Sequence, residues 1–262
     1  MTRAYFTAAT CANSLFKPLS VNTPPKFFPI IDSTIAINVK HPSNKGGLGP
    51  SSHVIIKSYN IVSKSYRDSI LLHPYYRSIF IGLILSDGWL QKRFHWNPRI
   101  GFKQSLIHFE FFWATYNVLY HFCSSTPQLC HTYKRGKLFF ACQIQTRQLK
   151  CLNEIYYLFY DNGGKKCIKP NLLHYIDYIV LAYWIMGDGA KRNNGIVLCT
   201  QGFSFPEVVT LMNILKIKFD INSTIHLDNN KPTIYLSKSN LNKILPYITP
   251  YFVNSMKYKI HL

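Results

Sequence analysis

Two short apolar stretches, one in each half of the chain, constrain its fold more than any other feature. Residues 78–88 read SIFIGLILSDG and residues 178–189 read YIVLAYWIMGDG, so each apolar run ends in a small residue, an aspartate and a glycine. Each stretch is predicted to be a short buried helix that the glycine stops, because glycine readily supplies the left-handed residue just past a helix end. Asp87 and Asp188 then lie in the last turn of their helices.

A carboxylate at this end of a helix is electrostatically unfavourable, because the helix C-terminus already carries a partial negative charge. A divalent cation held by oxygen ligands would compensate, and two such helix ends together would surround one or two metal ions with two carboxylates. The chain has only 11 Asp and Glu residues in all. Two of them at the same point of a repeated pattern indicate a shared role.

Both stretches resemble the signature of the LAGLIDADG homing endonucleases, intron-encoded enzymes that cut long DNA sites. In that family the two motif helices pack side by side and their terminal acids hold the catalytic metals. The resemblance therefore implies that Asp87 and Asp188 are catalytic groups and metal ligands, and that Gly88 and Gly189 also belong to the metal site. It implies Mg²⁺ (or Mn²⁺) as the cofactor.

The two stretches differ at the positions where their helices would touch. In the first, Gly82 and Ser86 lie one turn apart on one face, where two backbones could approach closely. In the second, Tyr183 stands where the family has a glycine, and Ala182 is the nearest small residue. Close contact is therefore less expected from the second helix.

The chain is strongly basic, with 30 Lys and Arg residues against 11 Asp and Glu residues and a formal net charge of +19. This excess indicates a polyanionic partner, most simply nucleic acid, with a membrane surface or plain sequence bias as alternatives. The longest apolar runs are too short to cross a bilayer, which predicts a soluble protein without a membrane partner. Seven cysteines without a CxxC pair indicate a reducing compartment.

Heavy use of Lys, Asn, Ile, Phe and Tyr, whose codons are A/T-rich, suggests an organellar gene, in a mitochondrion or alternatively a chloroplast. The first 31 residues contain no acid. That composition is compatible with a transit peptide, or with sequence read through from upstream of the enzyme. Residues 1–68, which are rich in Pro, Gly and Ser, are predicted to be a poorly ordered extension with a short strand at 33–39.

The rest of the chain shows the same order of elements twice, in residues 69–172 and 173–262. Each half is predicted to contain a motif helix, two strands, a helix, a hairpin and a second helix. After the first motif these are strands 89–94 and 99–104, helix 106–123, hairpin 128–145 with its turn at 134–136, and helix 149–159. After the second they are a turn at 191–195, strand 196–201, helix 206–219, hairpin 223–237 with its turn at 228–230, and helix 240–251.

The resemblance makes these two halves pseudo-symmetric repeats of an α+β monomer, whose antiparallel sheets form a saddle over double-stranded DNA. Alternate residues of a strand face opposite ways, so one polar set on each sheet would contact DNA. The alternative is an ordinary sheet with one wet face. The candidate contact residues are Lys92, Arg93, Arg99, Lys103, Lys134, Arg135, Gln143, Gln145, Lys191, Arg192, Thr233 and Tyr235.

Two further sets of residues recur in both halves. Gln104 and Gln201 close strands predicted to be equivalent, where the family places a polar residue that helps to position the attacking water. A basic cluster follows the last helix of each half, where the family carries a lysine that would stabilise the charge developing on the phosphate. The candidates are Lys166 next to Lys165, and Lys257 or Lys259. Surface roles are the alternative for both sets.

The resemblance predicts a site-specific endonuclease that makes a metal-dependent double-strand break in a long DNA target and so promotes intron mobility. The main alternative is a maturase that binds its host intron RNA and assists splicing without cutting DNA. A third is an inactive relative, because Gly187 replaces the acid that would precede Asp188.

Overall fold

The computed structural model describes residues 62–134 and 136–262 of the chain. The first repeat is preceded by helix α1 (Lys64–Ser69) and contains α2 (Pro74–Leu85), β1 (Gly88–Gln91), β2 (Arg99–Ser105), α3 (Phe109–Leu119), β3 (Gln128–Lys134), β4 (Lys137–Gln145) and α4 (Asn153–Phe159). The second repeat contains α5 (Tyr178–Asp188), β5 (Gly189–Arg192), β6 (Gly195–Leu198), α6 (Phe205–Phe219), β7 (Thr224–Asp228), β8 (Lys231–Ser237) and α7 (Lys238–Ile248). The predicted strand at 33–39 lies outside the described residues.

Each repeat forms one four-stranded antiparallel sheet. The strand orders are β1-β2-β4-β3 and β5-β6-β8-β7, so the two sheets have the same topology. The hairpin turns fall where the sequence predicts them, and Gly136, Asn229 and Asn230 adopt the positive φ angles that such turns require. The predicted α+β fold with two similar repeats is confirmed.

Two helices of the first repeat are shorter than their sequence patterns, whereas α6 spans the whole of its predicted range. The apolar pattern at 106–123 becomes a 3-10 turn (Leu106–His108), then α3, then a second 3-10 turn (Tyr120–Phe122). The pattern at 149–159 likewise begins with a 3-10 turn before α4. In each repeat the core lies between helices and one face of the sheet, as Phe102 on β2 shows by packing against Phe111 and Phe112 of α3. No helix among residues 62–134 and 136–262 is long and apolar enough to cross a membrane.

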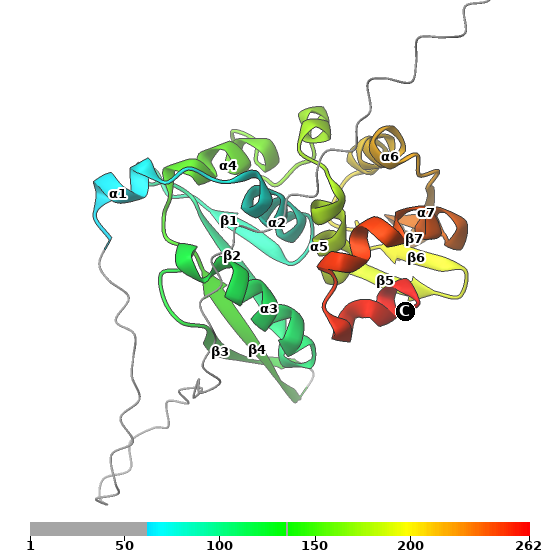
Figure 1. Ribbon diagram of the computed structural model, residues 1–262, viewed down its shortest axis with the longest axis horizontal. Helices are drawn as coiled ribbons and strands as arrows, with labels where there is room; N and C mark the ends of the chain where they lie inside the picture. Colours follow the sequence, from blue (N-terminus) through cyan, green and yellow to red (C-terminus); the bar gives the residue numbers. More distant parts are fainter. Residues whose placement is uncertain (1–61, 135) are drawn as a thin grey trace, which may run out of the picture. The chain divides into compact units, whose positions relative to one another are not determined.

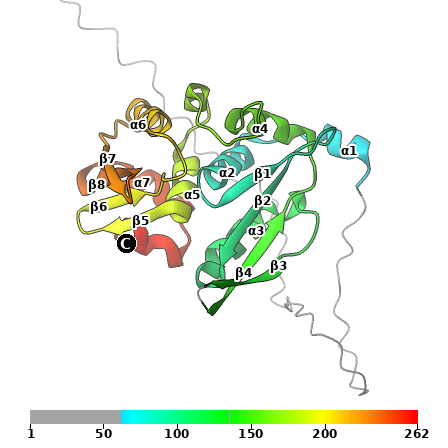
Figure 2. The same ribbon diagram turned by 180° about the vertical axis from the view of Figure 1, so that it is seen from behind.

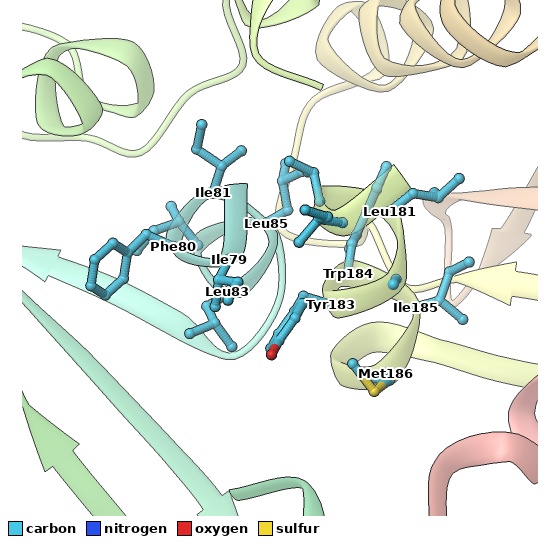
Figure 3. Close-up of a cluster of buried hydrophobic side chains, with 14 of the residues drawn as sticks. Ile79, Phe80, Ile81, Leu83, Leu85, Leu181, Tyr183, Trp184, Ile185 and Met186 are labelled. Atoms are coloured by element: carbon cyan, nitrogen blue, oxygen red, sulfur yellow. The ribbon is translucent and has the colours of Figure 1, made fainter. Parts of the chain in front are cut away.

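The two motif helices, α2 and α5, lie side by side between the sheets (Figures 1 and 2). Both helices are apolar on all sides, which suits a fully enclosed position. Figure 3 shows the side chain of Tyr183 projecting from α5 on the side of α2, whereas Phe80 points away from α5. Near the N-terminal ends of the two helices, the hydroxyl of Ser78 in α2 donates to Oδ2 of Asp177, the N-cap residue of α5, at 2.6 Å.

Tyr183 does not keep the helices apart, contrary to the sequence-based expectation. A Cβ on Gly82 would lie 2.6 Å from the Cβ of Tyr183 and 2.7 Å from the carbonyl oxygen of Val180. A Cβ on Gly187 would lie 2.3 Å from the hydroxyl of Ser86. Each helix therefore contributes one glycine at a different level, and close packing needs only one small residue at each contact.

Gly88 and Gly189 do not adopt the left-handed conformation that the sequence predicts. Gly189 has φ −73° and ψ 135°, and Gly88 is absent from the residues with positive φ. Both instead begin a strand that turns directly off the helix end. A Cβ on Gly88 would lie 2.8 Å from the carbonyl oxygen of Leu83, and one on Gly189 would lie 2.4 Å from that of Ile185. Glycine is needed here for close approach.

Candidate active site and nucleic-acid face

The aspartates of the two motifs meet at one end of the helix pair. Asp188 is the last residue of α5, and Asp87 follows α2 after the cap residue Ser86. A Cβ on Gly187 would lie 3.4 Å from Asp87 Oδ2, so the Asp87 carboxylate lies against the residue that precedes Asp188. Asp87 is exposed, whereas Asp188 is half-buried.

Burial, together with the neighbouring negative charge, perturbs the pKa of the more enclosed carboxyl, Asp188. The pKa of Asp188 is raised from 3.8 to about 7, chiefly by burial and then by the nearby negative charge of Asp87. The positive charges of Lys166 and Lys259 lower the pKa of Asp188 and so partly offset this increase. Without a further cation, the two carboxylates therefore resist being ionised together.

The donor set fits a hard divalent cation. Carboxylate oxygens suit Mg²⁺, which keeps several waters and is often held by only one or two carboxylates together with substrate phosphates. Within residues 62–134 and 136–262 no group of three or more His, Cys, Asp and Glu side chains could form a complete metal cage. Asp87 and Asp188 could hold such an ion, with water and a DNA phosphate completing the shell.

One lysine of each basic cluster interacts electrostatically with the two aspartates. Lys259, in the C-terminal 3-10 segment Asn254–Ile260, is buried and donates to the carbonyl oxygens of Met186 at 2.6 Å and Gly187 at 2.8 Å. Lys166 is partly enclosed, with its Nζ 5.5 Å from the centre of the Phe203 ring. Burial lowers the pKa of both lysines, and the charges of Asp87 and Asp188 partly oppose this.

The other lysine of each cluster is more open. Lys165 is exposed and Lys257 is half-buried, and neither side chain has a hydrogen bond or ion pair among the described residues. Within each cluster the structure therefore distinguishes the lysine that interacts with the aspartates, Lys166 or Lys259, from the adjacent one. The sequence leaves open which lysine of each cluster this is. The contacts that distinguish them come from distant segments: Lys259 donates to the end of α5, and Lys166 interacts with the charges of Asp87 and Asp188.

The two predicted glutamines do not occupy equivalent positions. Gln104 is nearly buried and its Nε2 donates to Asp87 Oδ2 at 2.8 Å. Gly88 pairs with Phe102 in the first sheet and Gly189 with Leu198 in the second, so Thr200, and not Gln201, matches Gln104. Gln201 donates to Asp228 Oδ2 at 2.9 Å instead.

On the first sheet the predicted contact residues share one face. Lys103 pairs with Gln143, and Gln145 with Gly101, opposite the face that buries Phe102 and Ile144. Other candidates make contacts within the protein: Arg99, on the same face as Lys103, donates to Gln91 Oε1 at 2.9 and 2.6 Å, Lys92 donates to the hydroxyl of Tyr157 at 2.7 Å, and Arg93 lies over the Trp96 ring. Lys134 ends β3, and Arg135 lies outside the described residues.

On the second sheet Lys191 and Arg192 are exposed at the end of β5. Tyr235 donates its hydroxyl to the carbonyl of Asn194 at 2.7 Å, and Thr233 donates to the carbonyl of His226 at 2.9 Å. Thr233 is 2% exposed. Sequence reasoning missed a hollow of about 190 Å³ on this face, which is lined by Ala190, Arg192, Val197, Cys199, Gln201, His226, Leu227, Asp228 and Thr233.

His108 is a second residue that sequence reasoning missed. It ends the 3-10 turn after β2 and its pKa is lowered by burial and by Lys259, while Asp87 opposes this. The imidazole is thus within electrostatic reach of both the first aspartate and the buried lysine. No sequence signal points to it, because the contact joins residues that are far apart in the chain.

Comparison with known proteins agrees with this architecture. The model of the LAGLIDADG DNA endonuclease family matches residues 77–244. A probable intron-encoded endonuclease 1 of Wickerhamomyces canadensis is 34% identical over 234 residues, which cover 82% of this chain and 93% of that protein. The cytochrome b mRNA maturase bI2 of Saccharomyces cerevisiae is 31% identical over 196 residues, or 70% of this chain and 46% of the maturase.

A solved structure has the same fold. The homing endonuclease I-WcaI, bound to its DNA recognition sequence, aligns with a TM-score of 0.69 and 32% sequence identity. The alignment covers 82% of this chain and 95% of the I-WcaI chain.

Proposed function

Because the chain belongs to the LAGLIDADG DNA endonuclease family, we propose that it is a homing endonuclease that makes a metal-dependent double-strand break in a long DNA target. The observation that carries this proposal is the meeting of Asp87 and Asp188 at the end of the helix pair, flanked by one lysine from each repeat. Similarity to I-WcaI, a homing endonuclease bound to DNA, supports the same class of substrate.

In this proposal Asp87 and Asp188 would hold Mg²⁺ or Mn²⁺, which supplies charge neutralisation and a polarised phosphate when bound. Gln104 orients the Asp87 carboxylate through its hydrogen bond. Lys259 and Lys166 bring fixed positive charge to the edge of the site, where negative charge develops on the phosphate during attack by water. Lys259 also fixes the end of α5, and hence Asp188, through its two carbonyl contacts.

Two features support DNA as the polyanion that is bound. The formal charge of +19 favours contacts with the phosphates of a nucleic acid. The polar faces of the two sheets, including Lys103 and Gln143 on the first and Arg192 on the second, offer donors and acceptors of the kind that read base edges. We further propose a monomer encoded in a mitochondrion, with the chloroplast as the alternative.

The maturase function remains the second candidate, because similarity extends to the maturase bI2 of Saccharomyces cerevisiae. A maturase would use the same basic chain to hold host intron RNA and would not need the paired acids. Retention of both Asp87 and Asp188 favours the nuclease.

Cleavage of a plasmid that carries the intronless allele of the host gene tests the proposal. The assay compares Mg²⁺ with EDTA at low and moderate salt, and wild type with Asp87→Asn. We expect a linear product that requires the metal and is lost in Asp87→Asn, while DNA affinity stays within about tenfold. Tight, salt-sensitive binding without scission would reject the nuclease, and splicing of the host intron would then test the maturase.

A further inference from the structure

The connection between β1 and β2, residues 92–98, exposes two aromatic rings. Phe94 is 86% exposed and Trp96 is 49% exposed. The centre of the His95 ring lies 4.1 Å from that of Phe94, with the two ring planes inclined at 63°. Exposed aromatic side chains grouped on one loop are typical of an interaction site, since water solvates such rings poorly.

The loop is fixed at its base. The side chain of Asn97 donates to Asp68 Oδ1 of α1 at 3.3 Å and accepts from Asn153 Nδ2 of α4 at 2.9 Å. The backbone N–H of Trp96 donates to the carbonyl of Arg93 at 3.0 Å, which closes the turn. The exposed rings are thus presented by an anchored loop.

His95 holds the tip of the turn in the left-handed region, at φ 65°. A residue with a Cβ rarely adopts this conformation, which is maintained only when the surroundings enforce it. The sharp turn directs Phe94 away from the body of the protein. Local strain at a projecting aromatic is consistent with selection for contact with a partner.

The loop borders the polar face of the first sheet. Gln91, Arg93, Trp96, Asn97, Arg99 and Gln148 line one small hollow, which joins the loop to the face that carries Lys103 and Gln143. The guanidinium of Arg93 lies 5.3 Å from the centre of the Trp96 ring. Aromatic rings set among cations fit a partner that offers both phosphates and flat π faces, which is a nucleic acid.

The second repeat has no equivalent aromatic loop among the described residues. Its corresponding strands, β5 and β6, are joined by Asn193 and Asn194, and that connection contains no aromatic residue. Whatever the rings bind, they bind it at the first repeat alone.

We propose that Phe94, supported by Trp96, stacks on a base at the end of the DNA target that the first repeat binds, and so partly unstacks one step of the duplex. This inference rests on the proposed DNA-binding function. Apolar side chains can act as wedges between base steps, and the flanking cations hold the phosphates while the step opens. The outcome is a target that is recognised asymmetrically, by shape and deformability at one end.

The test uses a duplex selected from a randomised library by the wild-type protein, with 2-aminopurine placed at successive outer positions of the half-site. Binding is measured with Ca²⁺ in place of Mg²⁺ for wild type, Phe94→Ala and Phe94→Tyr. Phe140→Ala is the matched control, because Phe140 is 43% exposed on the opposite, helix-covered face of the same sheet. Single-stranded RNA from the same type of selection serves as the comparison probe.

We expect wild type to change the 2-aminopurine fluorescence at one outer position, and Phe94→Ala to abolish that change and weaken binding by about 5- to 100-fold. Phe94→Tyr should retain both, and Phe140→Ala should match wild type. The salt dependence should be unchanged in Phe94→Ala, since no cation is lost.

Unchanged fluorescence and affinity in Phe94→Ala, with wild type binding and cutting normally, would overturn the inference and leave the proposed function intact. Weaker binding of RNA alone would also overturn it. Failure of wild type to select any duplex would instead count against the proposed function.

Discussion

Gly82 and Tyr183 face each other where α2 and α5 touch: a Cβ on Gly82 would lie 2.6 Å from the Cβ of Tyr183. The backbone of the first motif helix therefore rests directly on the base of the tyrosine side chain. The end of the helix pair that carries the aspartates depends on this contact, because Asp87 and Asp188 lie only about one and a half helical turns beyond Gly82 and Tyr183. The contact is the basis of the first prediction.

Replacing Gly82 with alanine should destabilise the protein by about 1–3 kcal/mol, the usual cost of overpacking a close contact. The new methyl group must displace Tyr183 or the backbone of Val180, and this exceeds the benefit of alanine's better helix propensity. Urea denaturation measures the loss. Gly202→Ala is the matched control, because a Cβ there meets nothing within 4 Å. Equal stability of the two variants would contradict the close packing.

The raised pKa of Asp188 predicts how metal-free stability depends on pH. A carboxyl whose folded pKa is about 7 binds its proton more tightly in the folded state than in the unfolded state, where the value is 3.8. Its contribution is therefore lost as the pH rises from about 4 to above 7. We expect Asp188→Asn to raise the melting temperature by several degrees at pH 8 in EDTA, and by less than half as much at pH 5.

Mg²⁺ should stabilise wild type more at pH 8 than at pH 5, because the ionised pair is what the cation binds. His108 titrates in the opposite sense: its lowered pKa favours the neutral form in the folded protein, so its contribution falls as the pH falls. The comparison of wild type with Asp188→Asn isolates the aspartate. Parallel melting curves at both pH values would contradict the assignment.

Substitutions of the two lysines of the C-terminal cluster, Lys257 and Lys259, should differ in their effect on stability and on the cleavage rate. Lys259→Met removes the donor to the carbonyls of Met186 and Gly187, and should cost about 1–3 kcal/mol of stability as well as about 10²–10³ in the rate of cleavage. Lys257→Met should change the rate by less than about threefold, because the half-buried Lys257 makes no hydrogen bond to the end of α5 and a partly solvated charge contributes little. Single-turnover cleavage at saturating enzyme separates the rate from DNA affinity.

In the first repeat, Lys166→Gln should lower cleavage strongly, whereas Lys165→Gln should act only through a small change in DNA affinity. The reason is that Lys166 interacts electrostatically with both aspartates, whereas Lys165 is exposed to solvent. Similar rates for Lys165→Gln and Lys166→Gln would reject the role proposed for Lys166.

Substitutions of the two glutamines, Gln104 and Gln201, should also differ in their effect on the cleavage rate. Gln104→Ala removes the hydrogen bond to Asp87 and should lower the cleavage rate by about 10- to 100-fold with DNA affinity nearly unchanged. Gln201→Ala should have a much smaller effect on the rate, because its amide contacts Asp228 in the hollow on the second sheet. A larger effect from Gln201→Ala would show that the strand register does not predict function here.

Much of the fold follows from local sequence patterns. The hairpins at β3–β4 and β7–β8 were predicted together with their turns, because residues such as Gly136 and Asn229 favour positive φ and alternation sets the strands. Helix lengths were less well predicted. Apolar periodicity does not distinguish an α-helical turn from the 3-10 turns that flank α3 and precede α4.

The candidate site was predicted in part. Asp87 and Asp188 could be selected because the motif repeats, and the structure brings them together. The offset between Gln104 and Gln201 could not, because residues 196–199 are all apolar and show no alternation that would fix which face each residue occupies. His108 and Asp228 carry no motif and gain their positions only from packing.

The sequence by itself determined the repeated order of elements, the apolar helix pair and the two acids at its end, since each depends on patterns within a few residues. The tertiary structure alone decided that Lys166 and Lys259 turn inward, and that Gly88 and Gly189 serve close approach without a left-handed turn. Those outcomes depend on contacts between distant segments, as between Lys259 and Gly187. Such contacts are fixed by close packing in three dimensions, which sequence spacing does not encode.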